Sequence, residues 1–423
     1  MRLLLASVIL VGCKAPCGDV RHTESPHTIE LSGLSGARVA YTAAGRPQSA
    51  AVSDGLALLT GLPPLTEVAY QLLDADDAMV CQEAVMSWNL PPGLPQITVT
   101  ETQREQINPD QVLLGTIIGS ASVLFAIDRE GRWLWHHSLE EDRIAIDVHI
   151  QDATILHNVF ASEFTEDVGE IRRLSLAGEP LETIRTEGAH HVFEPTAHGS
   201  LVWPAVDIRD WYDEKRDETI TIVGDRLMES LPDGSTTELF NVWDHEDPTR
   251  HDQWHAAFYE QGFDWTHANG VHYSAERDSY LLSLGHLDAI YEIDRATGAP
   301  LRRISTDWVQ RNNTAFTFQH DPHWTDDGTL MMMSYTDNVS PVAIEYTVNT
   351  EQEKLVEIWS DVSDQDGLTM LGQARRLPDG NILINYGGAG IIREITPAGE
   401  VVWELSSPLG AWFGNVRIAD ALF

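Results

Sequence analysis

The chain has 423 residues, which is too many for one ordinary hydrophobic core, so two domains or one large repeat architecture is expected. Apolar residues make up 43% and charged residues 22%, a composition that argues against a disordered protein. The formal net charge of −38 argues against a nucleic-acid-binding protein, because phosphates require a basic surface. Such acidity indicates a strongly solvated surface.

The first thirteen residues predict export from the cytoplasm. Arg2 precedes a short apolar run, residues 3–11, which cannot span a bilayer as a helix. The run ends in Leu10-Val11-Gly12-Cys13, which resembles a bacterial lipobox, in which the cysteine becomes the lipidated first residue. We therefore expect a signal peptide at 1–12, a lipid anchor on Cys13, and a place in the bacterial cell envelope, in the periplasm or at the outer membrane surface. An ordinary signal peptide with a chance cysteine is the alternative.

Residues 13–26 are polar and contain proline, which predicts a tether. From 27 to 97, short apolar runs punctuated by Gly and Pro predict a small antiparallel β-sandwich of the fibronectin III or immunoglobulin type. Within it, Leu62–Tyr70 resembles the tyrosine corner of fibronectin type III-like domains. The other two cysteines, Cys17 and Cys81, either pair and tie the tether to this domain or stay unpaired. Neither lies beside a histidine or in a CxxC motif, so no zinc site is expected there.

From residue 98 to 423, an apolar hairpin recurs at intervals of about fifty residues. Its copies are Phe125–Gly131, Leu174–Gly178, Leu231–Gly234, Tyr291–Gly298, Ile395–Gly399 and, with a turn that has lost its glycine, Ala343–Val348. Six units with room for four strands each predict an all-β fold, a six-bladed β-propeller. The C-terminal strand around Phe413–Ala419 has no blade after it, so we expect it to be the inner strand of the first blade and to close the ring. A parallel solenoid is the alternative.

Histidine recurs where the innermost strand of a unit is expected to begin. In a propeller these strands line the central channel, and their starts lie at one face. The strand starts are Val148-His149, His190-His191, Trp265–Asn269, Gln319-His320 and Gly372–Arg375. A single buried or exposed histidine is more often structural than functional. The repeated position in several units predicts that these side chains converge.

The segment Asp264–Asn269 is similar to the Asp-Trp-x-His-x-Asn motif of the bacterial arylsulfate sulfotransferases. Gln319-His320, Asp337-Asn338 and Leu377–Leu383 also resemble signatures of that family, and the resemblance covers roughly residues 100–423. The family has a six-bladed propeller, often with a small N-terminal β-sandwich, and works in the periplasm. The resemblance implies a ping-pong transfer of a sulfuryl group from an aryl sulfate to a phenolic acceptor, without a cofactor or a metal.

The same resemblance assigns roles to individual residues. His320 matches the nucleophile that becomes a transient sulfohistidine. His267 and Asn269 match residues that hold the sulfuryl oxygens or help proton transfer to the leaving phenolate, and His191 matches a further histidine of the site. The residues expected to contact substrate are His190, Trp265, His286 and Gln319, with Trp265 stacking on the aryl ring.

One departure from the family pattern concerns the cation that binds the sulfuryl group. The family has Ser-x-Arg-His where this chain has Ser283-Leu284-Gly285-His286, so Gly285 replaces the arginine. Losing such a ligand costs about 3–4 kcal/mol of transition-state stabilisation, by analogy with deleting an oxyanion-hole donor. The cations available to compensate are His286, Arg311 and Arg375.

Two functions therefore fit the sequence. The first is an aryl sulfotransferase that takes small aromatic donors and acceptors and is held at the membrane by its lipid. The second is a non-catalytic propeller that binds an anionic or aromatic ligand, or a partner protein, at the same place. Gly285 favours the second, whereas Asn269 and His320 favour the enzyme, because packing alone does not call for them at the channel. The natural substrates, and whether the chain forms a homodimer, stay open.

Overall fold

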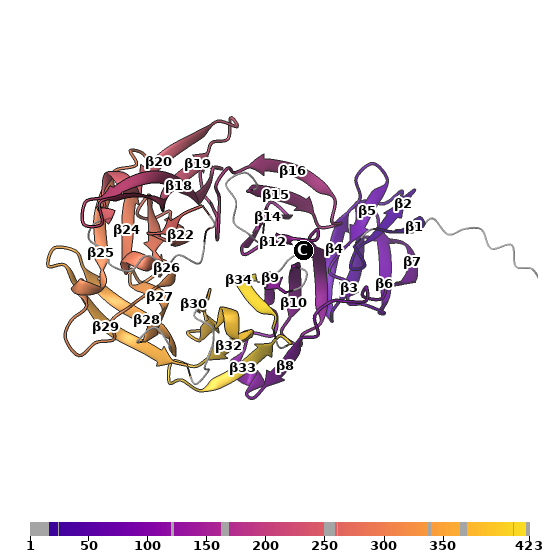
Figure 1. The fold of residues 1–423 in the computed structure, drawn as a ribbon. Helices are drawn as coiled ribbons and strands as arrows, with labels where there is room; N and C mark the ends of the chain where they lie inside the picture. The colour runs from indigo at the N-terminus through magenta and orange to yellow at the C-terminus, as the bar shows by residue number, and fades with distance from the viewer. Residues whose placement is uncertain are drawn as a thin grey trace, which may run out of the picture.

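The computed structural model describes residues 17–23, 25–119, 122–161, 169–248, 259, 261–336, 340–363, 370–408 and 410–419. The predicted signal peptide, Cys13 and Asp337-Asn338 lie outside these ranges. The described chain is nearly all β, with a small two-sheet unit beside a ring of six sheets (Figure 1). Its helices are single 3₁₀ turns, and none is long and apolar enough to cross a membrane. These turns are η1 (Arg104–Gln106), η2 (Val242–Asp244), η4 (Gly285–Leu287), η5 (Thr306–Trp308) and η6 (Gly387–Ala389).

The N-terminal unit is a sandwich of two antiparallel sheets, with strand orders β1-β2-β5 and β4-β3-β6-β7. The strands are β1 (Asp19–His22), β2 (Ile29–Ser32), β3 (Arg38–Ala43), β4 (Arg46–Ala51), β5 (Leu56–Leu59), β6 (Glu67–Leu73) and β7 (Met79–Met86). Buried and exposed residues alternate along β3 and β6, so one face of that sheet packs inward. The Tyr70 hydroxyl lies within hydrogen-bond distance of the carbonyl of Cys17 and the carboxylate of Glu83.

The stretch predicted as a tether contributes to this sandwich. Strand β1 pairs with β2 along its whole length, and a disulfide joins Cys17 to Cys81 on β7. Cys17 is fully buried in the core of the sandwich. From Cys17 to His22 the chain is therefore part of the folded unit, because pairing with β2 satisfies its backbone groups.

The propeller consists of six sheets arranged in a ring, named blades 1 to 6 in chain order, and their strands are antiparallel except at β21 (Figure 1). Blade 1 contains β34 (Trp412–Ala419), β9 (Val112–Ile118), β10 (Val123–Asp128) and β11 (Trp133–Ser138). Blade 2 contains β12 (Arg143–Ile144) and β13 (Val148–Gln151), which both pair with β14 (Thr154–Ala161), then β15 (Glu170–Ser175) and β16 (Pro180–Arg185). Blade 3 contains β17 (Glu194–Pro195), β18 (Leu201–Asp213), β19 (Glu218–Ser230) and β20 (Thr236–Asn241), with β21 (Phe263–Asp264) parallel to β19.

The remaining three blades follow the same inner-to-outer order. Blade 4 contains β22 (Ala268–Ser274), β23 (Ser279–Leu284), β24 (Ala289–Asp294) and β25 (Pro300–Ser305). Blade 5 contains β26 (His320–Trp324), β27 (Leu330–Thr336), β28 (Ser340–Asn349) and β29 (Lys354–Val362). Blade 6 contains β30 (Gln373–Arg376), β31 (Ile382–Asn385), β32 (Ile391–Ile395) and β33 (Val401–Ser406), followed by β8 (Thr98–Glu101).

Two strands from opposite ends of the propeller sequence close the ring. The C-terminal β34 pairs with β9 and is the inner strand of blade 1, which confirms the predicted closure. Strand β8, just before blade 1 in the chain, pairs with β33 and becomes a fifth strand of blade 6. Figure 1 shows the two ends of the propeller segment meeting at this seam, where the yellow β33 lies beside the purple β8. Each of these two strands thus completes a blade with residues from the other end of the propeller segment, so the first and last blades are held together by hydrogen-bonded strands.

The sandwich docks on the ring through polar contacts to blade 1 and its entry. His27 Nε2 lies 2.9 Å from Nδ1 of His136 on β11. The Arg46 guanidinium donates hydrogen bonds to the carbonyls of Pro109 and Asp110, each at 2.6 Å. Burial lowers the pKa of His27 to about 4 and that of His136 to about 4, so both rings are neutral at pH 7 and can share one hydrogen bond.

Acid is expected to weaken this docked arrangement. Between the ordinary histidine pKa of 6.5 and the folded value of about 4, the unfolded chain binds more protons than the folded chain, so stability falls as the pH falls. Urea unfolding at pH 7, 5.5 and 4.5 measures the free energy of unfolding. A His27→Gln/His136→Gln double variant should show a shallower loss of stability over this range, and an unchanged slope would contradict the prediction.

Candidate active site

The inner strands of blades 3 to 6 begin at residues in the left-handed region of backbone conformation. These residues, with their φ angles, are His191 (59°), His267 (50°), Phe318 (45°), Asp321 (50°) and Leu371 (63°). A non-glycine residue in this region costs of order 1–3 kcal/mol and persists only where the surroundings enforce it. Strained backbone is therefore concentrated at one end of the inner strands, and the predicted site residues lie at this end.

His267 is the centre of an aromatic cluster. Its ring stacks on His286 at 4.7 Å and on Phe318 at 5.0 Å between centroids, and it meets His191 edge-on at 4.9 Å. Its Nδ1 lies 2.6 Å from the Oδ2 of Asp264, which is buried. Because an ionised carboxylate only accepts, His267 donates its Nδ1–H to Asp264. The carboxylate fixes the orientation of the ring and supports a positive charge on it whenever Nε2 also carries a proton.

His320 lies beside Asn269, as the sequence predicted from their shared place in the repeat. Asn269 Nδ2 is 3.3 Å from His320 Nε2, and both side chains are buried. Burial, with a contribution from the nearby His267, lowers the pKa of His320 to about 3. The ring is therefore neutral at pH 7. With the amide donating to it, Nε2 carries the lone pair and Nδ1 the proton.

His191 joins the cluster from blade 3. Its carbonyl accepts a hydrogen bond from Asn158 Nδ2 at 2.7 Å, which holds the left-handed corner. Burial lowers the pKa of His191 well below the ordinary value, and the neighbouring His267 and His190 lower it further. The structure thus brings together His191, His267, Asn269, His286 and His320, from three consecutive blades.

Three residues predicted to contact substrate have other positions. Trp265 is fully buried and packs edge-on against Trp243, so it fills the core beside blades 3 and 4 instead of offering a stacking surface. Gln319 is also fully buried, and its amide donates to the Ser283 hydroxyl and to two blade 4 carbonyls. His190 is buried behind His191 and bonds to it. These three residues support the site and do not line it.

Phe318 is a site residue that the sequence interpretation missed. It is partly exposed, stacks on His267, and lies 5.4 Å from His320 between ring centroids. An aromatic ring beside two imidazoles is suited to contact an aryl group. The sequence feature that could have identified Phe318 as a site residue is its position directly before Gln319-His320.

Gly285, at the position of the family's arginine, lies in a tight space between residues of the candidate site. A Cβ atom built on Gly285 lies 2.7 Å from Asn269 Nδ2, 3.2 Å from Phe318 Cδ2 and 3.3 Å from the His267 carbonyl. The missing arginine is not replaced by Arg375, whose guanidinium is paired with Asp321 at 2.6 Å, or by Arg311, which is exposed. Among the three predicted compensating cations, His286 is the one in the cluster.

Substituting Gly285 with alanine is expected to damage the site more than the fold. The added Cβ must displace the Asn269 amide, which is the far end of a side chain, away from His320. Since small displacements of positioned groups lower rates steeply, we expect the rate of a reaction at this site to fall by about 10- to 100-fold. Steady-state kinetics beside a thermal unfolding curve would separate the two effects. Wild-type kinetics in Gly285→Ala would show that Asn269 has no role.

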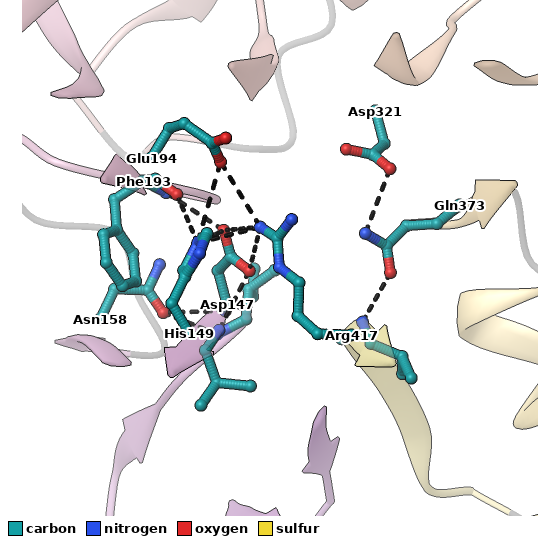
Figure 2. Close-up of polar contacts among 12 residues, drawn as sticks. Asp147, His149, Asn158, Phe193, Glu194, Asp321, Gln373 and Arg417 are labelled. Atoms are coloured by element: carbon teal, nitrogen blue, oxygen red, sulfur yellow. Dashed lines mark hydrogen bonds and ion pairs between the residues drawn. The ribbon is translucent and has the colours of Figure 1, made fainter. Parts of the chain in front are cut away.

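A polar network also ties the inner strands of several blades together. Arg417 on β34 donates to both oxygens of Asp147, at 3.1 and 3.2 Å, and Gln373 bridges Asp321 and the Val416 amide (Figure 2). Burial opposes ionisation of Asp147, but the charge of Arg417 outweighs it and lowers the pKa. The network holds blades 1, 2, 5 and 6 in register around the channel. It includes Asp321, the residue after His320.

Asp264, His267 and His286 are the one group in the described ranges whose potential metal ligands all lie within 4.8 Å of one another. Two ligands of a tetrahedral zinc ion lie about 3.3 Å apart, as follows from bond lengths of 2.0–2.1 Å. The Asp264 and His267 ligand atoms are 2.6 Å apart, which is a hydrogen-bond distance. We therefore interpret this group as a hydrogen-bonded pair with His286 stacked beside it.

A comparison with models of protein families found one family that matches this chain. Residues 96–302 match the family model described as Arylsulfotransferase (ASST), which confirms the resemblance over that range. No curated protein matches the chain.

Solved structures show only distant similarity. A protein of unknown function from Bacteroides caccae is 16% identical, with 74% of this chain and 99% of that chain covered and a TM-score of 0.45. A catalytically inactive virginiamycin B lyase from Staphylococcus aureus, with quinupristin, is 11% identical over 73% and 74% of the two chains, with a TM-score of 0.37. An auxiliary nutrient binding protein from Bacteroides ovatus is 13% identical over 90% and 82%, with a TM-score of 0.37. Similarities of this size carry no functional argument.

Proposed function

We propose that this chain, whose residues 96–302 match the arylsulfotransferase family, transfers a sulfuryl group from an aryl sulfate to a phenolic acceptor through a sulfohistidine at His320. The observation that carries the proposal is the state of His320, a buried neutral imidazole hydrogen-bonded by Asn269 beside a carboxylate-backed His267. A neutral imidazole is a competent nucleophile, and a covalent intermediate divides one difficult transfer into two easier steps.

In the first half of the reaction, the Nε2 lone pair of His320 attacks sulfur, and the bond between sulfur and the aryl oxygen breaks. The aryl oxide leaves with a proton donated by an acidic group of the site, and the same group takes a proton from the acceptor in the second half. In the second half, a phenol loses its proton and its oxygen attacks the same sulfur, so that the S–N bond breaks and His320 is restored. Atoms and charge balance over the cycle, and no redox change occurs.

The sulfuryl oxygens carry negative charge throughout, so positioned donors stabilise the transition state. A protein with a net charge of −38 must provide positive character locally. His267, with Asp264 accepting its Nδ1–H, can carry that charge on Nε2–H, and the Asn269 amide offers a second donor close to His320. His286, stacked on His267, is the neighbouring imidazole at the position next to the lost arginine.

Phe318 provides the aromatic contact that the substrate class requires. It lies against both His267 and His320, so an aryl ring resting on it brings its sulfate close to the nucleophile. We also propose that the chain acts in the cell envelope, held by a lipid on Cys13, from the lipobox-like residues at the N-terminus.

The second candidate is a propeller that binds an anionic or aromatic ligand without turning it over. Gly285 favours it, since the usual sulfuryl-binding arginine is absent and the space at this position is filled. Both candidates use the same residues, and they differ in turnover.

The test is turnover of p-nitrophenyl sulfate by the full chain, with and without phenol acceptors. The proposal predicts nitrophenol release that continues only in the presence of an acceptor. Binding of aryl sulfates by calorimetry with no release, across several donors, would support the binding protein instead.

A further inference from the structure

Asp225 is a buried carboxylate that the proposed reaction does not use directly. It lies on β19 of blade 3 and accepts three hydrogen bonds. His190 Nε2 is 2.8 Å from its Oδ1, and the Thr266 hydroxyl and the Ala268 amide are 2.6 and 2.7 Å from its Oδ2. Thr266 and Ala268 flank His267, so one side chain supports two histidines of the site.

The ionisation of Asp225 determines the protonation of His190. Burial raises the pKa of Asp225, but the charge of His190 and the hydrogen bonds from His190 and Thr266 outweigh it, and the pKa is lowered. An ionised carboxylate has no proton to give, and the amide of Ala268 can only donate. His190 therefore carries a proton on Nε2.

The contact between His190 and His191 then has two possible arrangements. Their Nδ1 atoms are 2.7 Å apart, so one of them donates a proton and the other accepts it. When His190 is neutral, its Nδ1 accepts from His191, and His191 Nε2 carries a lone pair. When His190 is an imidazolium, its Nδ1 donates, and His191 Nε2 carries a proton. The two arrangements differ by one proton, and Nε2 of His191 changes from acceptor to donor.

We propose that Asp225, His190 and His191 form a proton relay that supplies one proton to the site and takes one back. This inference rests on the proposed sulfuryl transfer, which needs that exchange. In the first half, His191 Nε2–H passes its proton to the departing aryl oxide while the His190 Nδ1–H moves to His191 Nδ1. In the second half, the phenol returns a proton to His191 Nε2, and the shared proton moves back to His190. Throughout the cycle, the proton on His190 Nε2 stays on that nitrogen and is donated in a hydrogen bond to Asp225.

The position of His191 suits this role. It meets His267 edge-on at 4.9 Å, and the groups whose charges act on it are His267, His190, His320 and His286. These surroundings disfavour a lasting positive charge on His191, whereas His190 lies beside the Asp225 carboxylate. The stored charge therefore belongs on His190, one ring away from the site.

Asp225→Asn tests the relay because it keeps the shape and reverses one hydrogen bond. The Ala268 amide cannot reorient, so the asparagine oxygen stays with it and the asparagine NH₂ faces His190. His190 Nε2 must then lose its proton, which moves to Nδ1. Thr266→Val is the matched control, since it removes another hydrogen bond to the same carboxylate without touching His190.

The measurement is ¹⁵N NMR of the full chain labelled at histidine, with His190 assigned by loss of its signals in His190→Gln. We expect a protonated Nε2 on His190 in the wild type and in Thr266→Val, and an unprotonated Nε2 in Asp225→Asn. A protonated Nε2 in all three would overturn the relay. This readout needs no turnover, so it decides the relay even if the proposed function fails.

Steady-state kinetics are the second test of the proposed relay. Asp225→Asn should lower kcat by about 100-fold or more while KM changes little, because proton transfer is lost and binding is kept. Thr266→Val should lose less than about 10-fold. Equal losses in the two variants would show that Asp225 is merely structural. If Asp225→Asn does not fold, His190→Gln replaces it, since glutamine still donates to Asp225 but cannot store a proton.

Discussion

Replacing His320 with alanine is expected to abolish aryl sulfate turnover, with a loss of kcat of about 10⁴-fold or more, because the covalent intermediate cannot form. Its neighbours offer no substitute nucleophile at the same point. Asn269 is a poor nucleophile, and His267 uses Nδ1 for Asp264 and stacks between two rings. The measurement is the rate of nitrophenol release at saturating donor and acceptor.

The control for this substitution is His198→Ala, which removes a half-exposed histidine outside the cluster and should keep wild-type rates. Because alanine leaves a cavity at a buried position, thermal unfolding of His320→Ala must accompany the assay. A well-folded His320→Ala protein that keeps a tenth or more of the wild-type rate would rule out His320 as the nucleophile.

Replacing Asp264 with asparagine should lower kcat/KM by about 10²–10³-fold, which is the range for losing one preorganised charge interaction. Asp264 Oδ1 has no hydrogen-bond partner among the described residues, so the asparagine NH₂ can take that position while its oxygen still accepts from His267. The orientation of His267 is kept, and the negative charge that supports its imidazolium is lost. Asp264→Asn therefore tests the effect of the carboxylate charge without changing the orientation of His267.

Steady-state kinetics with Asp278→Asn as control test this prediction, since Asp278 is a half-exposed carboxylate away from the cluster. We expect Asp264→Asn to raise KM for the anionic donor as well as to lower kcat. Unchanged kinetics in Asp264→Asn would mean that His267 acts as a neutral ring and that the sulfuryl charge is balanced elsewhere.

Much of the fold could be predicted because repetition is visible in sequence. The orphan strand at Phe413–Ala419 required a partner, and the first blade lacked an inner strand, so ring closure followed. Strand β8 was not predicted, because four residues without a glycine turn give no repeat signal. The role of Cys17–His22 was also missed, since a short polar strand next to a linker looks like the linker itself.

Position in the repeat predicted part of the candidate site, although His149, at the same place in blade 2, contacts Asp147 and Arg417 instead of the cluster. Predictions made from adjacency in the sequence failed. His191, His267, Asn269 and His320 occupy equivalent strand starts and come together. Trp265 and Gln319 were assigned to substrate because they neighbour those residues, but the left-handed turns at His267 and Phe318 direct neighbouring side chains elsewhere. Asp225 lies on a different strand of blade 3 and far from any motif, so only the three-dimensional structure connects it to His190.

The central claim is the covalent intermediate, and mass spectrometry of a rapidly quenched reaction tests it most directly. The full chain is mixed with p-nitrophenyl sulfate in the absence of acceptor, then digested under conditions that preserve phosphoramidate-like bonds. We predict that the peptide containing His320 gains the mass of one sulfuryl group, and that a phenol added before quenching removes it. A chain that releases nitrophenol without any adduct on His320, or with the adduct on another residue, would contradict it.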